Sequence, residues 1–136
     1  MDLDSKQRVL LAIYTEYQKD IPTMEDITAE ALELDIEVFG IAVEKLINEQ
    51  MINASPKVVE RRGLSKQRIE DVNLHGVMMS AKGLEYVEQK LSIDQTLSNK
   101  EKVDKVMESA GNWGWEQIKD IGTKVLAEMA IKAVGI

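Results

Sequence analysis

Apolar residues recur every three to four positions over two stretches within the first fifty residues, which predicts amphipathic helices. The first stretch has the spacing i, i+3, i+4 and i+7 at Leu10, Ile13, Tyr14 and Tyr17. Asp4 precedes it and Gln7 follows three positions later, as in a capping box. The second stretch, from Asp35 to about Gln50, repeats the pattern at Phe39, Ala42, Val43, Leu46 and Ile47. Each helix is expected to bury one face.

A shorter helical pattern lies between these two. Pro22 ends the first helix, because the residue before a proline is disfavoured in the α region. Thr23 then precedes two acids, and apolar residues follow at helical spacing at Ile27, Ala31 and Leu34. We therefore expect a second helix, and a compact core of three helices. The outer face of the third helix is expected to expose Glu37, Gly40, Ile41, Glu44, Lys45 and Asn48.

The periodicity changes from helix to strand after residue 50. Met51 to Ala54 reads as one strand, and Ile69 to Met79 alternates as a second, with a break in phase that predicts a bulge. The turn between them is expected at Gly63-Leu64-Ser65, and Ser80 is placed to cap a fourth helix. The pattern therefore predicts an α+β, mainly α fold, with a β-hairpin between the third and fourth helices.

Residues 92–136 read as a linker and a two-helix extension of a domain that spans residues 1–91. Ser98 and Glu101 form a second capping-box pattern, and residues 111–114 are expected to be a hinge. The last helix, from about Trp115, is apolar over a wide face, although Asp120 and Lys124, like Glu128 and Lys132, stand at a favourable i, i+4 spacing. We expect that face to be covered by a second copy of the chain, a protein partner or its own domain, through Trp113, Trp115, Ile118, Ile121, Val125, Leu126 and Met129.

Composition narrows the class of protein. A chain of 136 residues with 44% hydrophobic and 30% charged residues is globular, and long enough for one domain with an appendage. It has no cysteine, so disulfides and thiolate metal sites are excluded. The start lacks the pattern of a signal peptide, and no run of apolar residues is long enough to cross a membrane. We expect a cytoplasmic protein.

The net charge of −7 is unevenly distributed along the chain. Residues 1–50 carry −8 and residues 51–90 carry +2. Within residues 57–68, five bases accompany a single acid, so the predicted hairpin is the one basic region of an acidic chain.

Two segments resemble winged-helix proteins. Residues 34–52 are similar to the third helix and following strand of that superfamily, and residues 79–87 are similar to the Leu-Thr-x-x-Gly-x-x-Tyr-Leu motif that closes the wing. The spacing of Phe39, Ala42, Val43, Leu46 and Ile52 most resembles the small prophage-associated YjcQ-type proteins. The resemblance covers roughly residues 5–91, and it implies a winged helix (three-helix core plus hairpin wing) of bacterial or phage origin, in a family whose biochemical role is poorly defined.

A winged helix that reads duplex DNA places its third helix in the major groove and its wing over the backbone. The residues suited to phosphate contacts are Lys57, Arg61, Arg62, Lys66 and Arg68, and those suited to base edges are Lys45 and Asn48. We therefore expect a phage-type regulatory or accessory protein that binds double-stranded DNA and oligomerises through its tail. Acids on the second and third helices oppose DNA docking. The alternative is an adaptor that binds a basic partner through those two helices and the apolar C-terminal helix.

No residue cluster indicates a reaction. His75 is the only histidine and has no neighbouring ligand, so it is expected at the surface. Ser80 reads as a helix cap, because no base stands at a readable spacing from it. The last helix carries three acids and three bases, which does not favour a membrane surface. We expect no enzyme activity, no cofactor, no metal ion and no membrane partner.

Overall fold

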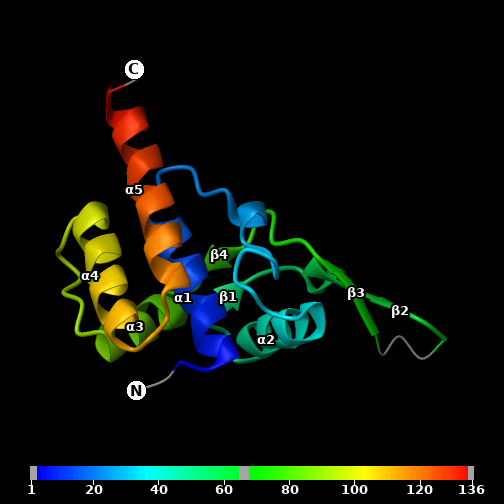
Figure 1. Cartoon of the computed structure of the whole chain (residues 1–136). Helices are drawn as coiled ribbons and strands as arrows, with labels where there is room; N and C mark the ends of the chain where they lie inside the picture. The colour runs from blue at the N-terminus through cyan, green and yellow to red at the C-terminus, as the bar shows by residue number, and fades with distance from the viewer. Residues whose placement is uncertain (1–2, 65–67, 135–136) are drawn as a thin grey trace.

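Five α-helices and four short strands make up the part of the chain that the computed structural model describes, residues 3–64 and 68–134 (Figure 1). The helices are α1 (Ser5–Tyr17), α2 (Ile36–Asn48), α3 (Ala81–Lys90), α4 (Asn99–Asn112) and α5 (Gln117–Val134). The strands are β1 (Ile52–Asn53), β2 (Val59–Arg62), β3 (Arg68–Val72) and β4 (Met78–Met79), with 3₁₀ turns η1 (Met24–Asp26) and η2 (Pro56–Val58). The expected α+β, mainly helical class is confirmed.

Helix α1 lies at the centre of the molecule. The predicted capping box is present, because Asp4 accepts a hydrogen bond from the Gln7 backbone at 2.8 Å and the Gln7 side chain accepts one from the Asp4 backbone at 3.0 Å. Every residue from Val9 to Glu16 is buried, which is a wider buried surface than one apolar stripe predicts. The reason is that α1 contacts all four other α-helices of the described chain.

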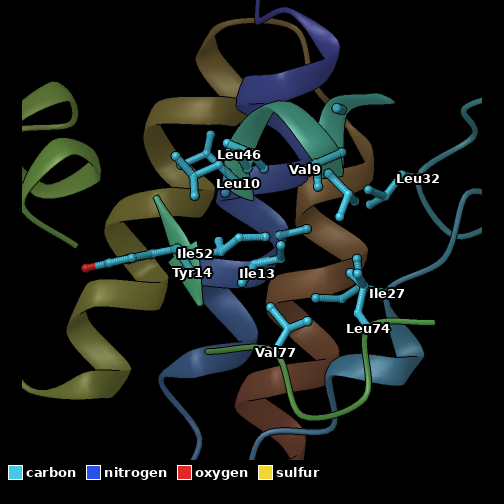
Figure 2. Packing of buried hydrophobic residues seen from close by; sticks show 14 of the residues in the cluster. Val9, Leu10, Ile13, Tyr14, Ile27, Leu32, Leu46, Ile52, Leu74 and Val77 are labelled. Atoms are coloured by element: carbon cyan, nitrogen blue, oxygen red, sulfur yellow. The ribbon is translucent and has the colours of Figure 1, made fainter. Parts of the chain in front are cut away.

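The helix expected after Pro22 does not form. In the described structure the Thr23 side chain makes no capping hydrogen bond, and only the single 3₁₀ turn η1 follows. The Thr28 hydroxyl accepts a hydrogen bond from the Ala31 backbone at 3.0 Å, a local bond that competes with helix formation. Of the predicted stripe only Ile27 is buried, whereas Ala31 is exposed and Leu34 half-buried. Met24 and Leu32 are the other buried side chains, and Figure 2 shows Ile27 and Leu32 inside the apolar cluster. Residues 24–34, called the acidic segment below, therefore lie against the core as irregular chain.

Helix α2 follows its predicted pattern on the inner face and departs from it on the outer face. Asp35 caps it by accepting a hydrogen bond from the Glu37 backbone at 2.8 Å, and the predicted Phe39, Ala42, Val43 and Leu46 are buried. Gly40 was expected to be exposed, but it is buried under Ile69 of β3. A Cβ atom at Gly40 would lie 2.5 Å from the Ile69 Cδ1 atom. The hairpin thus covers part of the helix face that the sequence assigned to DNA.

The strands form two separate two-stranded antiparallel sheets. β1 pairs with β4, with Ile52 opposite Met79, and β2 pairs with β3, with Val59 opposite Val72. The register shifts between Glu60 and Arg61, which confirms the predicted bulge. The second strand was expected to be continuous, but the chain leaves the sheet between β3 and β4 and buries Leu74 and Val77 in the core (Figure 2). Figure 1 shows the β2–β3 hairpin projecting away from the helical body.

The C-terminal extension folds back onto the rest of the chain. Ser98 and Glu101 form the predicted capping box at the start of α4, and Gly114, with a φ of 87°, lies in the turn before α5. Helix α5 packs on α4 and α1, and Gly122 lies against the Met107 side chain. Of the three coverings expected for the tail, the described structure shows its own domain, since Trp115 and Ile118 belong to the same apolar cluster as α1.

Two buried ionic clusters fasten the helices together. The Tyr14 hydroxyl donates to the Glu88 carboxylate at 2.9 Å, and the Lys102 ammonium lies 3.1 Å from the same carboxylate, which joins α1, α3 and α4. Burial, together with this hydrogen bond, raises the pKa of Tyr14 well above its ordinary value. Just beyond the end of α1, the Lys19 ammonium pairs with Glu16 of α1 at 2.5 Å and with Glu128 of α5. Burial lowers the pKa of Lys19, but the hydrogen bonds to Glu128 and Glu16 outweigh it and raise that pKa overall.

Candidate functional site

Two of the three hairpin arginines, Arg61 and Arg62, are bonded to carboxylates of the chain itself. The Arg61 Nε atom donates to Glu44 of α2 at 3.1 Å, and its terminal nitrogen pairs with the same carboxylate. This hydrogen bond raises the pKa of Arg61. Arg62 pairs with Glu70 across the hairpin at 2.5 Å. Arg61, one pair from the tip-side end of the strands, therefore holds the hairpin to α2, and the charges of Arg61 and Arg62 are matched locally.

The charge balance around the hairpin is close to zero. Among its neighbours, the Glu37 side chain accepts a hydrogen bond from the Ile69 backbone at 2.9 Å. The acids on the hairpin and on the helix face below it are as numerous as the five bases of residues 57–68: Glu37, Glu44, Glu60, Glu70 and Asp71. Because phosphate attraction depends on net positive potential, this arrangement removes most of the long-range attraction that the sequence predicted.

The other predicted DNA-binding residues lie on two surfaces. Lys57 is exposed in the η2 turn before the hairpin, Arg68 is exposed on β3, and Lys66 lies outside the described residues. Lys45 and Asn48 are exposed on the outer face of α2, in line with two exposed apolar side chains, Val38 and Ile41. This stripe of α2 is not covered by the hairpin, but half of it is apolar.

The predicted oligomer interface is divided between the core and the surface. Trp115, Ile118 and Val125 are buried in the chain's own core, so they are not free to contact a second copy while α5 is docked. The other members of the predicted set are half-buried: Trp113, Ile121, Leu126 and Met129. The wide apolar face is wide because α5 packs between two helices of its own chain rather than on one surface.

A groove with an acidic rim lies between the acidic segment and α5. It encloses about 280 Å³. Its apolar floor includes Ile27, Leu32 and Ile121, and its exposed acids are Asp26, Glu30, Glu33 and Asp120. Lys124 is the one base among the lining residues that the structure describes. We call this surface, including Ala31, Glu16 and Gln117, the acidic groove.

Two carboxylates of the acidic groove have no partner among the described residues. Asp26 pairs with Lys124 at 3.3 Å, and Glu33 accepts a hydrogen bond from the Gln117 side chain at 2.6 Å. Neither the Glu30 nor the Asp120 carboxylate has a hydrogen bond or ion pair within the described part of the chain. The i, i+4 pair expected between Asp120 and Lys124 is absent, because Lys124 turns across the groove to Asp26.

The sequence contained one signal for this groove. Residues 20–37 hold seven acids and no base, which is why an adaptor for a basic partner was the alternative hypothesis. The sequence could not show that α5 forms the second wall of the groove, because docking of α5 beside the acidic segment depends on tertiary packing. The acids of both elements therefore could not be assigned to one site from the sequence.

Two further polar residues considered in the sequence, His75 and Ser80, have partners in the structure. His75 is exposed, as expected, and its Nδ1 atom lies 2.8 Å from Glu25. A backbone hydrogen bond, with a smaller effect of His75, lowers the pKa of Glu25. Ser80 caps α3 by accepting from the Gly83 backbone at 2.9 Å. Within residues 3–64 and 68–134, no group of His, Asp and Glu side chains could hold a metal ion.

No protein-family model, curated protein or solved structure matches this chain. Among the residues described, no helix combines the length and apolar character that crossing a bilayer requires.

Proposed function

We propose that this protein is a non-enzymatic binding module that holds a basic segment of a protein partner in the acidic groove. The observation that carries the proposal is the pair of unpartnered carboxylates, Glu30 and Asp120, on opposite walls above an apolar floor. An arginine or lysine placed between them would form charge-assisted hydrogen bonds, which are about twice as strong as neutral ones.

The size of the groove favours a peptide segment. A volume of about 280 Å³ is at the lower limit of pockets that hold whole small molecules. It suits one or two side chains of a longer chain that continues across the surface. Lys124 supports a cationic occupant, since an ammonium group of the protein already lies between the walls against Asp26.

A winged-helix topology is the finer assignment that we propose for the fold. The order of α1, η1, α2, the β-strands and α3 supports it, with the single turn η1 in the place of the second helix. In this view the β2–β3 hairpin is the wing and residues 92–136 are the addition that supplies one wall of the acidic groove. The proposed role as an adaptor thus depends on α5, which the resemblance does not cover, as well as on the acidic segment, which it does cover.

A fluorescent peptide that alternates arginine and leucine tests the proposal by anisotropy. We expect a Kd of about 1–100 µM, and no binding of the same peptide with glutamate in place of arginine. The double substitution Glu30→Gln and Asp120→Asn is expected to weaken binding about tenfold. A matched control, Asp104→Asn with Glu108→Gln on the exposed side of α4, is expected to leave it unchanged. Equal losses in both double variants would contradict a defined site.

Duplex DNA is a second candidate, favoured by the projecting hairpin. The Arg62 side chain is 75% exposed and Arg68 is exposed, so both can reach a ligand in solution. Exposed ion pairs contribute only about 0–1 kcal/mol, so phosphate could replace Glu70 as the partner of Arg62. Binding to duplex DNA would weaken steeply with salt, and the slope would flatten when Arg61 and Arg62 become alanine. The absence of binding at low salt would exclude this candidate.

A further inference from the structure

The tip of the β2–β3 hairpin carries basic and apolar side chains, which complement the acidic rim and the apolar floor of the acidic groove. We define the hairpin tip as Arg62, Gly63, Leu64 and Arg68. Leu64 is fully exposed, and it follows Gly63, whose φ of 101° turns the chain. An apolar side chain between exposed arginines complements an apolar floor between exposed carboxylates.

We propose that the occupant of the acidic groove is the hairpin tip of a second copy of this chain. Leu64 would lie on the floor beside Ile121, and Arg62 and Arg68 would pair with the unpartnered Glu30 and Asp120. This inference rests on the proposed function, and it names the partner for the same site.

The hairpin tip cannot reach the acidic groove of its own chain. Figure 1 shows the hairpin directed away from α5, which forms one wall of the groove. The strand ends next to the hairpin tip are fixed on α2 by the Arg61–Glu44 pair and by the packing of Ile69 on Gly40. These contacts, which neutralise Arg61, hold the hairpin in its direction away from α5 (Figure 1), where another molecule can meet the hairpin tip.

The association is expected to be weak and sensitive to salt. A hairpin tip in a groove buries less than the roughly 1,200 Å² that specific, stable interfaces need at minimum. Each molecule has one tip and one groove, so the contacts either close into a reciprocal pair or continue as an open chain. In both cases the mass rises with concentration and falls with added salt.

Sedimentation of the full chain from about 10 µM to about 1 mM, at about 50 mM and 300 mM NaCl, measures this. The expected result is a mass that rises above the monomer at low salt and returns towards it at high salt. The hairpin variant R62E/R68E and the groove variant E30K/D120K are each expected to weaken association at least tenfold. Leu64→Ser is expected to weaken it about three- to tenfold, without effect on the fold, because Leu64 is fully exposed.

A mixture of the two charge-reversal variants is the decisive arm. Each contributes one intact surface, and the two altered surfaces are again opposite in charge, so association is expected to recover. If association depended only on the net charge of each chain, the result would be different. The groove variant is less negative than the wild-type chain, whose net charge is −7, and reduced repulsion alone would strengthen its association.

Three results would overturn the inference: a monomer at about 1 mM and low salt, association unaffected by R62E/R68E, or stronger association of E30K/D120K. The alternating arginine–leucine peptide separates this inference from the proposed function. If the peptide binds the acidic groove while the chain stays monomeric, the groove takes a different partner and only this inference fails. If the peptide does not bind, both fail.

Discussion

The β2–β3 hairpin and the acidic groove have opposite charge in the sequence, and they differ in how far their charged side chains are paired within the chain. Arg61 and Arg62 of the hairpin are bonded to Glu44 and Glu70 of the same chain. In the acidic groove, Asp26 has a partner in Lys124, whereas Glu30 and Asp120 have none among the described residues.

This comparison shows that charge counted along a stretch of sequence is a poor measure of binding potential. The stretch of residues 57–68 is strongly basic by count, but helix α2 beneath it supplies Glu37 and Glu44. The acidic segment meets α5, which adds Asp120 and only one base. What decides the surface is the charge of the element packed alongside.

The largest expected effect concerns the wall of the acidic groove. Ile118→Ala removes a fully buried side chain between α5 and the core, and it is expected to lower the free energy of unfolding by about 2–5 kcal/mol. Peptide binding at the groove should fall with the loss of α5 docking, while the hairpin stays on α2. Ile131→Ala, on the same helix but 70% exposed, is expected to change stability by less than about 0.5 kcal/mol. Urea unfolding of both variants makes the measurement, and equal costs would contradict the docking of α5.

The contact between Gly40 and Ile69, through which the hairpin packs on α2, gives the converse test. Gly40→Val places methyl groups where Ile69 lies, and is expected to cost about 1–3 kcal/mol of stability through overpacking. Amide hydrogen exchange should then speed up in β3, with peptide binding at the acidic groove unchanged. Ile41→Val is the control, since Ile41 is next to Gly40 in α2 and is 41% exposed. Unaltered exchange in β3 would mean that the hairpin does not depend on this contact.

Alkaline pH should weaken the two buried ionic clusters, around Tyr14 and Lys19, that join α1 to α3 and α5. The pKa values of Tyr14 and Lys19 are raised from ordinary values of 10.0 and 10.5, so their protonated forms are favoured by folding. That stability is fully present below about pH 10. Above this pH the unfolded chain loses its protons first, so the free energy of unfolding declines by at most about 1.4 kcal/mol per pH unit for each group. Urea unfolding from pH 8 to 11 measures the slope. The variant Tyr14→Phe is expected to lose the part of this pH dependence that comes from Tyr14, so its slope should be shallower than that of the wild-type chain. An identical slope would exclude Tyr14 as a cause.

Local signals allowed most helices to be predicted. The caps at Asp4, Asp35, Ser80 and Ser98 act over three residues, so the sequence alone identifies them. The helix expected after Pro22 failed because a short segment depends on tertiary packing, and the Thr28 hydroxyl gave the backbone another bond. The exposed set on α2 was wrong at Gly40, because a missing side chain at that position admits Ile69 from a distant strand.

The candidate site was predictable only in part, for a similar reason. The excess of acids in residues 20–37 is visible in the sequence, but their arrangement opposite Asp120 is not. Likewise, the i, i+4 spacing correctly describes which residues of α5 share a face. It does not describe Lys124, whose partner Asp26 lies far away in the chain.

The smallest expected effects come from two exposed ion pairs, and they separate the two surfaces functionally. In double-mutant cycles the Asp26–Lys124 and Arg61–Glu44 pairs are each expected to contribute little to stability, because both are open to solvent. Their effects on the basic peptide should nevertheless differ. Lys124→Ala releases Asp26 for the ligand and should strengthen binding, whereas Arg61→Ala, which frees Glu44 outside the acidic groove, should not. If both substitutions strengthened binding equally, the peptide would be responding to net charge, and the distinction between the groove and the hairpin would have no functional content.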